Sequence, residues 1–147
     1  GLGAISNRDL LIFIREHKLN EMNGRWVVFG KQHFVANLIK TTGVSVVNGV
    51  NFLPDSEKNK ILDSEDQYRD IYNRYANIGY SFVESDQPTY VLDFLDNYTI
   101  EINPCSERIK NIGVRYLVLP KSYKEPNCLI RVTKKPLNQM HIYTYKD

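Results

Sequence analysis

The chain has 147 residues, a formal net charge of +2 and 42% hydrophobic residues, which fits one domain that buries about two-thirds of its unfolded surface. The basic residues are scattered, and Lys134 and Lys135 are the only adjacent pair, so a nucleic-acid-binding role is disfavoured. No run approaches the roughly 18 apolar residues of a membrane-spanning helix, and the start of the chain lacks the pattern of a signal peptide.

The first third of the chain predicts a helix followed by a strand–helix–strand unit. Ser6 is a candidate cap for the first helix, and Asp9 is a carboxylate suited to its first turn. Residues 25–29 form an apolar run of the buried-strand type, residues 32–41 have helical spacing, and residues 44–47 form a second apolar run. So short a unit implies two parallel neighbouring strands joined by a right-handed crossover.

The middle of the chain predicts a loop at residues 52–55 and then a polar helix. Ser64 and Gln67 have the spacing of a capping box, and Gly79 marks the end of this helix. The apolar positions that follow the box have the spacing of one helical face: Tyr68, Ile71, Tyr72, Tyr75 and Ala76.

The remainder predicts strands, several of them in hairpins. A strand at residues 80–83 precedes a hairpin of residues 90–95 and 98–102, in which Asp96 and Asn97 favour a type I′ turn. The last elements are a short helix at 104–112, a strand at 114–119, and a hairpin of 129–132 with 142–145 around residues 136–138.

These elements predict the α/β class, with α+β as the alternative. We expect a single domain over residues 1–147, three-layer-like, with a parallel βαβ core and added antiparallel hairpins. No internal repeat or linker divides the chain.

The sequence predicts no metal site, no cofactor and no catalytic residue. His17, His33 and His141 are far apart, and Gly30 lacks the further glycines of a dinucleotide-binding loop. Cys105 and Cys128 would close a loop of about 24 residues and stabilise the fold by about 3 kcal/mol if paired, but would stay reduced in a cytosol. The spacing leaves both states open.

Arg74 and Tyr75, at the end of the predicted polar helix, allow two interpretations. They could bind a phosphate or a sugar. Alternatively, Arg74 complements the carbonyl end of the helix and Tyr75 belongs to the core, which is the favoured interpretation.

Five blocks carry a resemblance to a known family: residues 47–52 (VNGVNF), 72–78 (YNRYANI), 102–105 (INPC), 113–118 (GVRYLV) and 142–145 (IYTY). They resemble the C-terminal extracytoplasmic domain of large polytopic bacterial membrane proteins related to GT-C-type glycosyltransferases. The resemblance runs from about Arg25 to the end.

The resemblance implies a non-catalytic domain on the extracytoplasmic side of a bacterial cell membrane. Its partners would be its own transmembrane region and a cell-surface glycan or lipid-linked sugar, because the family's catalytic carboxylate lies in the helical part. The full-length protein would then be a candidate glycosyltransferase. The missing initiator Met agrees with a piece of a longer protein, and an oxidising compartment favours pairing of Cys105 with Cys128.

Amide and guanidinium groups recognise hydroxyls and phosphates by directed hydrogen bonds. The ligand-binding candidates are Asn48, Asn51, Asn73, Arg74, Tyr75 and Asn103. The competing interpretation is that these side chains cap turns and satisfy backbone groups, and it is favoured for Asn48 and Asn103.

Two other functions stay open. One is a free-standing enzyme of doubly wound type that binds a nucleotide or a sugar near Gly30 and Asn48. The other is an interaction module on the last hairpin, where Lys134, Lys135 and Pro136 are better explained as guards against unwanted strand pairing.

Overall fold

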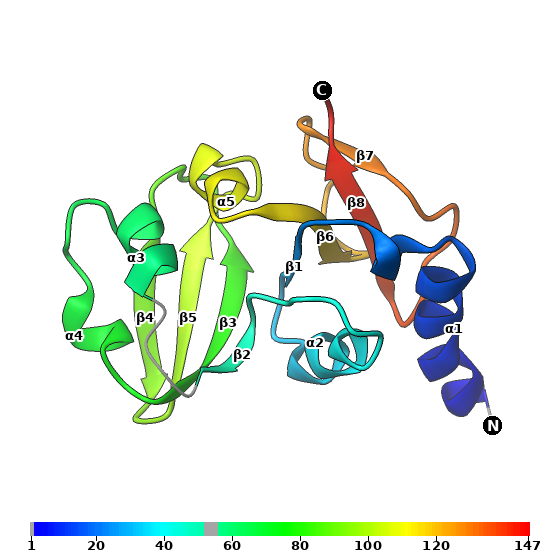
Figure 1. The fold of residues 1–147 in the computed structure, drawn as a ribbon, viewed down its shortest axis with the longest axis horizontal. Coiled ribbons are helices and arrows are strands. Elements are labelled where there is room, and N and C mark those ends of the chain that lie inside the picture. Colours follow the sequence, from blue (N-terminus) through cyan, green and yellow to red (C-terminus); the bar gives the residue numbers. More distant parts are fainter. Residues whose placement is uncertain (1, 52–55) are drawn as a thin grey trace.

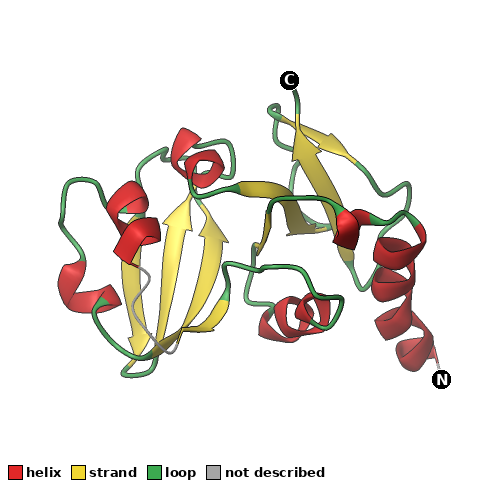
Figure 2. Ribbon diagram, in the orientation of Figure 1, coloured by secondary structure: helices red, strands yellow, loops and turns green. Residues whose placement is uncertain are grey.

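The chain folds into two four-stranded sheets that lie side by side, with helices around them (Figure 1, Figure 2). This computed structural model describes the backbone of residues 2–51 and 56–147 and the side chains of residues 8–50 and 57–147. The predicted loop at 52–55 lies outside the described residues. In chain order the elements are α1 (Leu2–Glu16), η1 (Leu19–Glu21), β1 (Arg25–Val28), α2 (His33–Lys40), β2 (Gly49–Asn51), α3 (Ser56–Leu62), α4 (Arg69–Tyr72), β3 (Ala76–Phe82), β4 (Thr89–Phe94), β5 (Asn97–Ile102), α5 (Glu107–Asn111), β6 (Val114–Pro120), β7 (Leu129–Arg131) and β8 (Met140–Tyr145).

The sheet with order β2-β3-β5-β4 is called here the central sheet, because the middle of the chain forms it. β3 and β5 are parallel, and β2 and β4 pair antiparallel on either side. In β5, buried residues alternate with partly exposed ones, and Tyr98, Ile100 and Ile102 point into the core. This alternation is typical of a sheet that packs on one face only.

The other sheet, with order β1-β6-β8-β7, is called the terminal sheet. β1 and β6 are parallel, whereas β8 is antiparallel to both β6 and β7. One hydrophobic cluster packs the terminal sheet against α1 and α2 around Trp26, and the other lies between the two sheets around Phe29. The backbone N–H of Gly30 donates to the carbonyl of Tyr80 at 2.9 Å, which joins the end of β1 to β3.

The predicted α/β class, with its three-layer-like arrangement around a parallel βαβ core, is wrong. The described residues form a small β-rich fold of two mixed sheets, and more of them lie in strands than in helices. The predicted strand at residues 44–47 runs parallel to β1 but makes one isolated bridge, Trp26 to Val46, because the chain then leaves at Gly49 to join the central sheet. β6, from the second half of the chain, is the parallel partner of β1.

The predicted helix from Ser64 to Ala76 is also wrong. The chain forms only the short α4, and Ala76 already begins β3. Asp63, rather than Ser64, satisfies the backbone here, since its carboxylate accepts from the N–H groups of Gln67 (2.9 Å) and Tyr68 (2.8 Å). The β-branched and aromatic residues of 76–82 favour a strand once a parallel partner is present.

Turn chemistry differs from the prediction at both hairpins. In the β4–β5 hairpin, Phe94 pairs with Asn97, so the turn is at residues 95–96, and it has no positive φ among its described residues. The pair of positive φ angles that a type I′ turn requires lies in the β7–β8 hairpin instead, at Asn138 (53°) and Gln139 (65°).

Several local predictions are confirmed, although with shifted bounds. β1, α2, α5 and β6 form where expected, as do the β4–β5 and β7–β8 hairpins. α1 begins at Leu2, so the predicted cap Ser6 lies inside the helix and its side chain is outside the described ones.

Candidate functional site

A cleft of about 510 Å³ lies where the carboxyl ends of β3, β5 and β6 meet. We call it the carboxyl-end cleft. Its lining combines an aromatic pair with amide, carboxylate and ammonium groups, beside one cysteine of a disulfide. These residues are Phe82, Tyr123, Asn103, Asn127, Glu84, Glu125, Lys124, Pro126 and Cys105.

The parallel pair of the central sheet builds one wall of the cleft. Phe82 pairs with Ile102, so Glu84 and Asn103 follow at the same edge of the sheet. Ligands of sheets with parallel strands commonly bind beyond this edge, where loops diverge from the strand ends.

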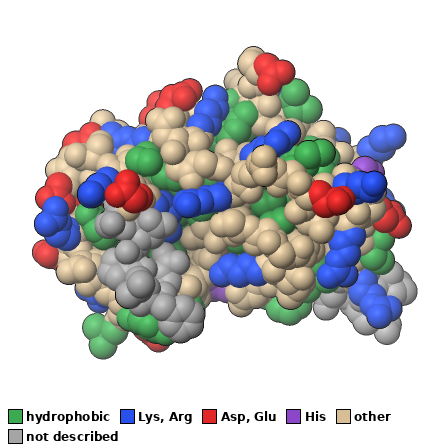
Figure 3. Space-filling view, viewed as in Figure 1, with side chains coloured by type: hydrophobic (Ala, Val, Ile, Leu, Met, Phe, Trp, Pro, Cys, Tyr) green, Lys and Arg blue, Asp and Glu red, His purple; other side chains and the backbone are tan. Residues whose placement is uncertain are grey.

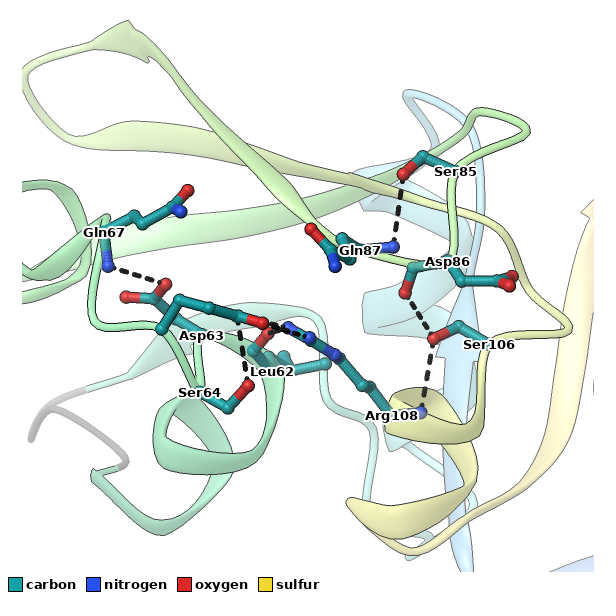
Figure 4. A network of polar contacts seen from close by, with 10 residues as sticks. Leu62, Asp63, Ser64, Gln67, Ser85, Asp86, Gln87, Ser106 and Arg108 are labelled. Carbon is teal, nitrogen blue, oxygen red and sulfur yellow. Dashed lines mark hydrogen bonds and ion pairs between the residues drawn. The ribbon is translucent and has the colours of Figure 1, made fainter.

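Hydrogen bonds hold the loop after β3 against the turn after β5. The N–H of Asn103 donates to the carbonyl of Ser85 at 2.8 Å. The hydroxyl of Ser106 donates to the carbonyl of Asp86 at 2.6 Å and accepts from the N–H of Arg108 at 3.3 Å, as drawn in Figure 4. This wall of the cleft is therefore fixed before a ligand arrives.

The loop of residues 121–128, which follows β6, builds the opposite wall. The ring of Tyr123 meets Phe82 edge to face, with centroids 5.9 Å apart, and burial raises the pKa of the Tyr123 hydroxyl. Cys128 is bonded to Cys105, and the hydroxyl of Tyr145 donates to the carbonyl of Pro104 at 2.8 Å. A covalent bond and a hydrogen bond thus join the two sheets at the base of the cleft.

Next to the hydrogen bonds of Ser106, a polar network fastens α3 to α5 (Figure 4). The guanidinium of Arg108 donates to the carbonyl of Leu62 at 2.7 Å and to both carboxylate oxygens of Glu65 at 3.0 and 2.7 Å. These bonds lower the pKa of Glu65 to about 2. Such bidentate pairing leaves Glu65 little capacity to act on a ligand, so its role is structural.

Asn48 is buried and uses both of its polar atoms on the backbone of β1. Its Oδ1 accepts from the N–H of Val28 at 2.8 Å, and its Nδ2 donates to the carbonyl of Val28 at 2.7 Å. These bonds agree with the backbone-satisfying interpretation. They leave neither polar atom of the Asn48 side chain unbonded for the ligand that a doubly wound fold would bind near Gly30.

Arg74 complements a helix end. Its guanidinium donates to the carbonyls of Ile71 (2.7 Å), Asp70 (2.9 Å) and Leu95 (3.3 Å). Tyr75 is 59% exposed, so it is not the core residue that the competing interpretation expected. Asn73 is exposed and follows α4 as its C-terminal cap residue.

The six predicted ligand-binding residues therefore do not form one site. Arg74 contacts Leu95, just before β5 begins, whereas Asn103 comes directly after β5 ends. Asn51 pairs with Ala76 at the end of β2, and its side chain lies outside the described ones. Of the five whose side chains the structure describes, only Asn103 lines the cleft.

Most of the residues that line the cleft carry no recognisable signal in the sequence. Phe82 and Glu84 come from a segment expected to end a strand, and residues 123–127 from a loop with no recognised pattern. The signal that could have located the cleft is a pair of parallel strands whose carboxyl ends share one edge of a sheet. The sequence pattern predicted residues 25–29 and 44–47 as such a pair, whereas β3 and β5 form the pair beside the cleft.

A metal site and a membrane span are also absent from the part of the chain that the structure describes. There, no group of three or more His, Cys, Asp and Glu residues could hold a metal ion. None of the helices described is both long and apolar enough to cross a membrane.

The comparison with family models gives one match, which spans residues 4–147 and is described as "Domain of unknown function (DUF7654)". The chain belongs to this family. No match was found among curated proteins or among solved structures. The family covers both sheets and the cleft between them, and its description states no activity.

Proposed function

We propose that this domain of the DUF7654 family is a non-catalytic binding module for a glycan, which it holds in the carboxyl-end cleft. The observation that carries the proposal is the pairing of Phe82 and Tyr123 with amide and carboxylate groups around one open hollow. An aromatic ring packs against the apolar face of a sugar, while amides and carboxylates form hydrogen bonds with its hydroxyls.

The size of the cleft supports a small saccharide. Its volume of about 510 Å³ is within the range of about 300–1,000 Å³ that ligand pockets have. Asn103 bonds the backbone, as its competing interpretation expects: its Oδ1 accepts from the N–H of Cys105 at 2.9 Å and its Nδ2 donates to the carbonyl of Glu84 at 3.4 Å. These bonds fix the orientation of its amide at the cleft.

We further propose that the domain works outside the cytoplasm as part of a bacterial membrane protein. The sequence resemblance supports this setting, and so does the disulfide of Cys105 and Cys128, since disulfides persist in oxidising compartments. Its partners would be its own transmembrane region and a cell-surface or lipid-linked sugar.

The test is calorimetric titration with neutral, amino and acidic disaccharides. Replacing Tyr123→Ser removes the ring that the ligand would cover, and we expect an affinity loss of about five- to tenfold, since such a contact contributes about 1 kcal/mol. Tyr75→Ser is the control for the same substitution, because Tyr75 is more exposed than the half-buried Tyr123 and lies outside the cleft. Equal loss in both variants, or no binding by the parent at millimolar concentration, would refute the proposal.

A further inference from the structure

A second hollow, of about 490 Å³, adjoins the carboxyl-end cleft. The two share Glu125, Pro126 and Asn127, so together they form one longer groove in which these three residues belong to both parts. The second hollow is also lined by Leu129, Ile130 and Arg131 of β7 and by Lys146, and we call it the β7 hollow. A ligand longer than one sugar ring that fills the cleft would reach it.

The charge changes sign along this groove. In the cleft, two carboxylates (Glu84 and Glu125) outnumber the single ammonium group of Lys124. In the β7 hollow, the two cations outnumber the one carboxylate, Glu125. The cleft end thus suits hydroxyl and amide groups, whereas the β7 end suits a negative group.

Arg131 is held in place by a buried histidine. Its Nη1 lies 3.4 Å from Nε2 of His141, a buried residue of β8. The Nδ1 of His141 lies 2.8 Å from the hydroxyl oxygen of Thr133, which also accepts from the N–H of Ile142 at 3.2 Å. These partners fit a neutral imidazole that donates from Nδ1 and accepts at Nε2.

Electrostatics keep that imidazole neutral. Burial, and next the charge of Arg131, lower the pKa of His141, while Glu125 acts in the opposite direction. Both charged groups that act on His141 line the β7 hollow. The guanidinium of Arg131 therefore has an oriented neutral acceptor on one side, and its remaining N–H groups are available for a second partner.

Lys146 is positioned by the end of β8. Its backbone N–H donates to the carbonyl of Cys128 at 2.8 Å, next to the disulfide that closes the base of the cleft. The exposed side chain of Ile130 lies in the same hollow and offers an apolar contact beside the two cations.

We propose that the β7 hollow is a subsite for an anionic group, a carboxylate or a phosphate, on a saccharide whose uncharged part occupies the carboxyl-end cleft. Arg131 binds two oxygens of that group with its planar fork, and Lys146, opposite Cys128 at the other end of β7, attracts it as a point charge. Glu125, which lines both hollows, repels the group but is outnumbered by the two cations in the β7 hollow. That the ligand of this subsite is a saccharide rests on the proposed function, whereas the affinity of the subsite for an anion does not.

The test compares three ligands: a neutral disaccharide, the same disaccharide ending in a uronic acid, and the corresponding sugar phosphate. Each is titrated into the parent, into Arg131→Gln/Lys146→Gln and into Lys134→Gln/Lys135→Gln. The last variant is the charge-matched control, because both of its lysines are exposed and neither lines the groove. We expect the first double variant to lose about tenfold or more in affinity for the charged ligands and to keep its affinity for the neutral one. The ratio of the two charged ligands shows whether carboxylate or phosphate is preferred.

Other outcomes separate the two proposals. Equal losses in both double variants mean long-range attraction only and overturn the subsite, as do equal affinities for neutral and charged sugars. If no sugar binds, inorganic phosphate alone is titrated while the amide NMR signals are followed. Shifts at Arg131 and Lys146 that the first double variant lacks would keep the subsite and reject the glycan function, and no such shifts would reject both.

Discussion

Both ends of the central sheet carry polar side chains, but they differ in how far these side chains are engaged by the fold. At the amino end of β5, the guanidinium of Arg74 is engaged by three backbone carbonyls. At the carboxyl end, the polar groups of Glu84, Lys124 and Asn127 line an open cleft. A polar residue type therefore says little about binding until its partners within the fold are known.

The surface around the amino end supports this contrast. Phe94 and Leu95, at the β4–β5 turn, are 71% and 84% exposed. Hydrophobic side chains protrude at the lower left of Figure 3, where this turn lies. Elsewhere on the face in view, acidic and basic side chains are mixed, with no basic stripe (Figure 3). The amino end of the central sheet is thus an exposed apolar surface, and the guanidinium of Arg74 beside it is already bonded to backbone carbonyls.

The largest effect is expected at Asn48, the buried amide whose polar atoms are both used. Asn48→Ala leaves the N–H and the carbonyl of Val28 buried without their partner, which should lower the free energy of unfolding by about 4 kcal/mol. Urea denaturation measures this change. A loss below about 1 kcal/mol would show that Asn48 is not consumed by the fold.

The disulfide comes next, because it joins the two walls of the cleft. Cys105→Ser/Cys128→Ser should cost about 3 kcal/mol, given the separation of 23 residues. It should also weaken ligand binding, since the loop that carries Tyr123 loses its covalent tie. Thermal unfolding and titration of the same variant check both effects, and an unchanged affinity would mean that the loop is held by its other contacts.

Arg74→Met sharpens the comparison of the two ends directly. It removes three hydrogen bonds to partly exposed carbonyls, so we expect a loss of about 1–2 kcal/mol in stability and no change in saccharide affinity. Urea denaturation and calorimetry on one preparation give both numbers. Reduced affinity with intact stability would move the binding site to the amino end.

The smallest effect concerns Glu65, an exposed carboxylate engaged by Arg108. Because its pKa is lowered to about 2, its contribution to stability is present above its ordinary pKa of 4.5 and is lost as the pH falls from there toward 2. Glu65→Gln should therefore reduce the melting temperature at about pH 6 and have little effect at about pH 2. An equal reduction at both pH values would exclude the ion pair as the cause.

Local pattern was enough for much of the secondary structure but not for the pairing of the strands. The 3.6-residue spacing of α2 is a local signal. Ser106 before α5 and Gly113 after it are local signals too, and both helices form as predicted. Tyr68, Ile71, Tyr72 and Tyr75 also fit a helical face, yet Ala76 begins a strand. It pairs with Asn51 of β2, and from Asn77 onward β5, twenty residues later, supplies a parallel partner. Such a choice depends on contacts distant in sequence.

The cleft could not be predicted from the sequence pattern for the same reason. Phe82 and Tyr123 are forty-one residues apart in the chain, and only the meeting of the two sheets brings their rings within 5.9 Å. Conversely, Arg74 and Asn48 remained candidates for ligand binding beside the favoured structural interpretation, because two of their backbone partners, Leu95 and Val28, become neighbours only on folding.

The most direct test of the central claim is to follow the backbone amide NMR signals of the parent domain during titration with the disaccharide that binds best. Binding in the cleft predicts shifts that grow with ligand at Phe82, Asn103 and Tyr123, with residues 73–75 and 95 unchanged. Shifts centred on residues 73–75 and 95, with the cleft silent, would contradict the assignment of binding to the carboxyl end.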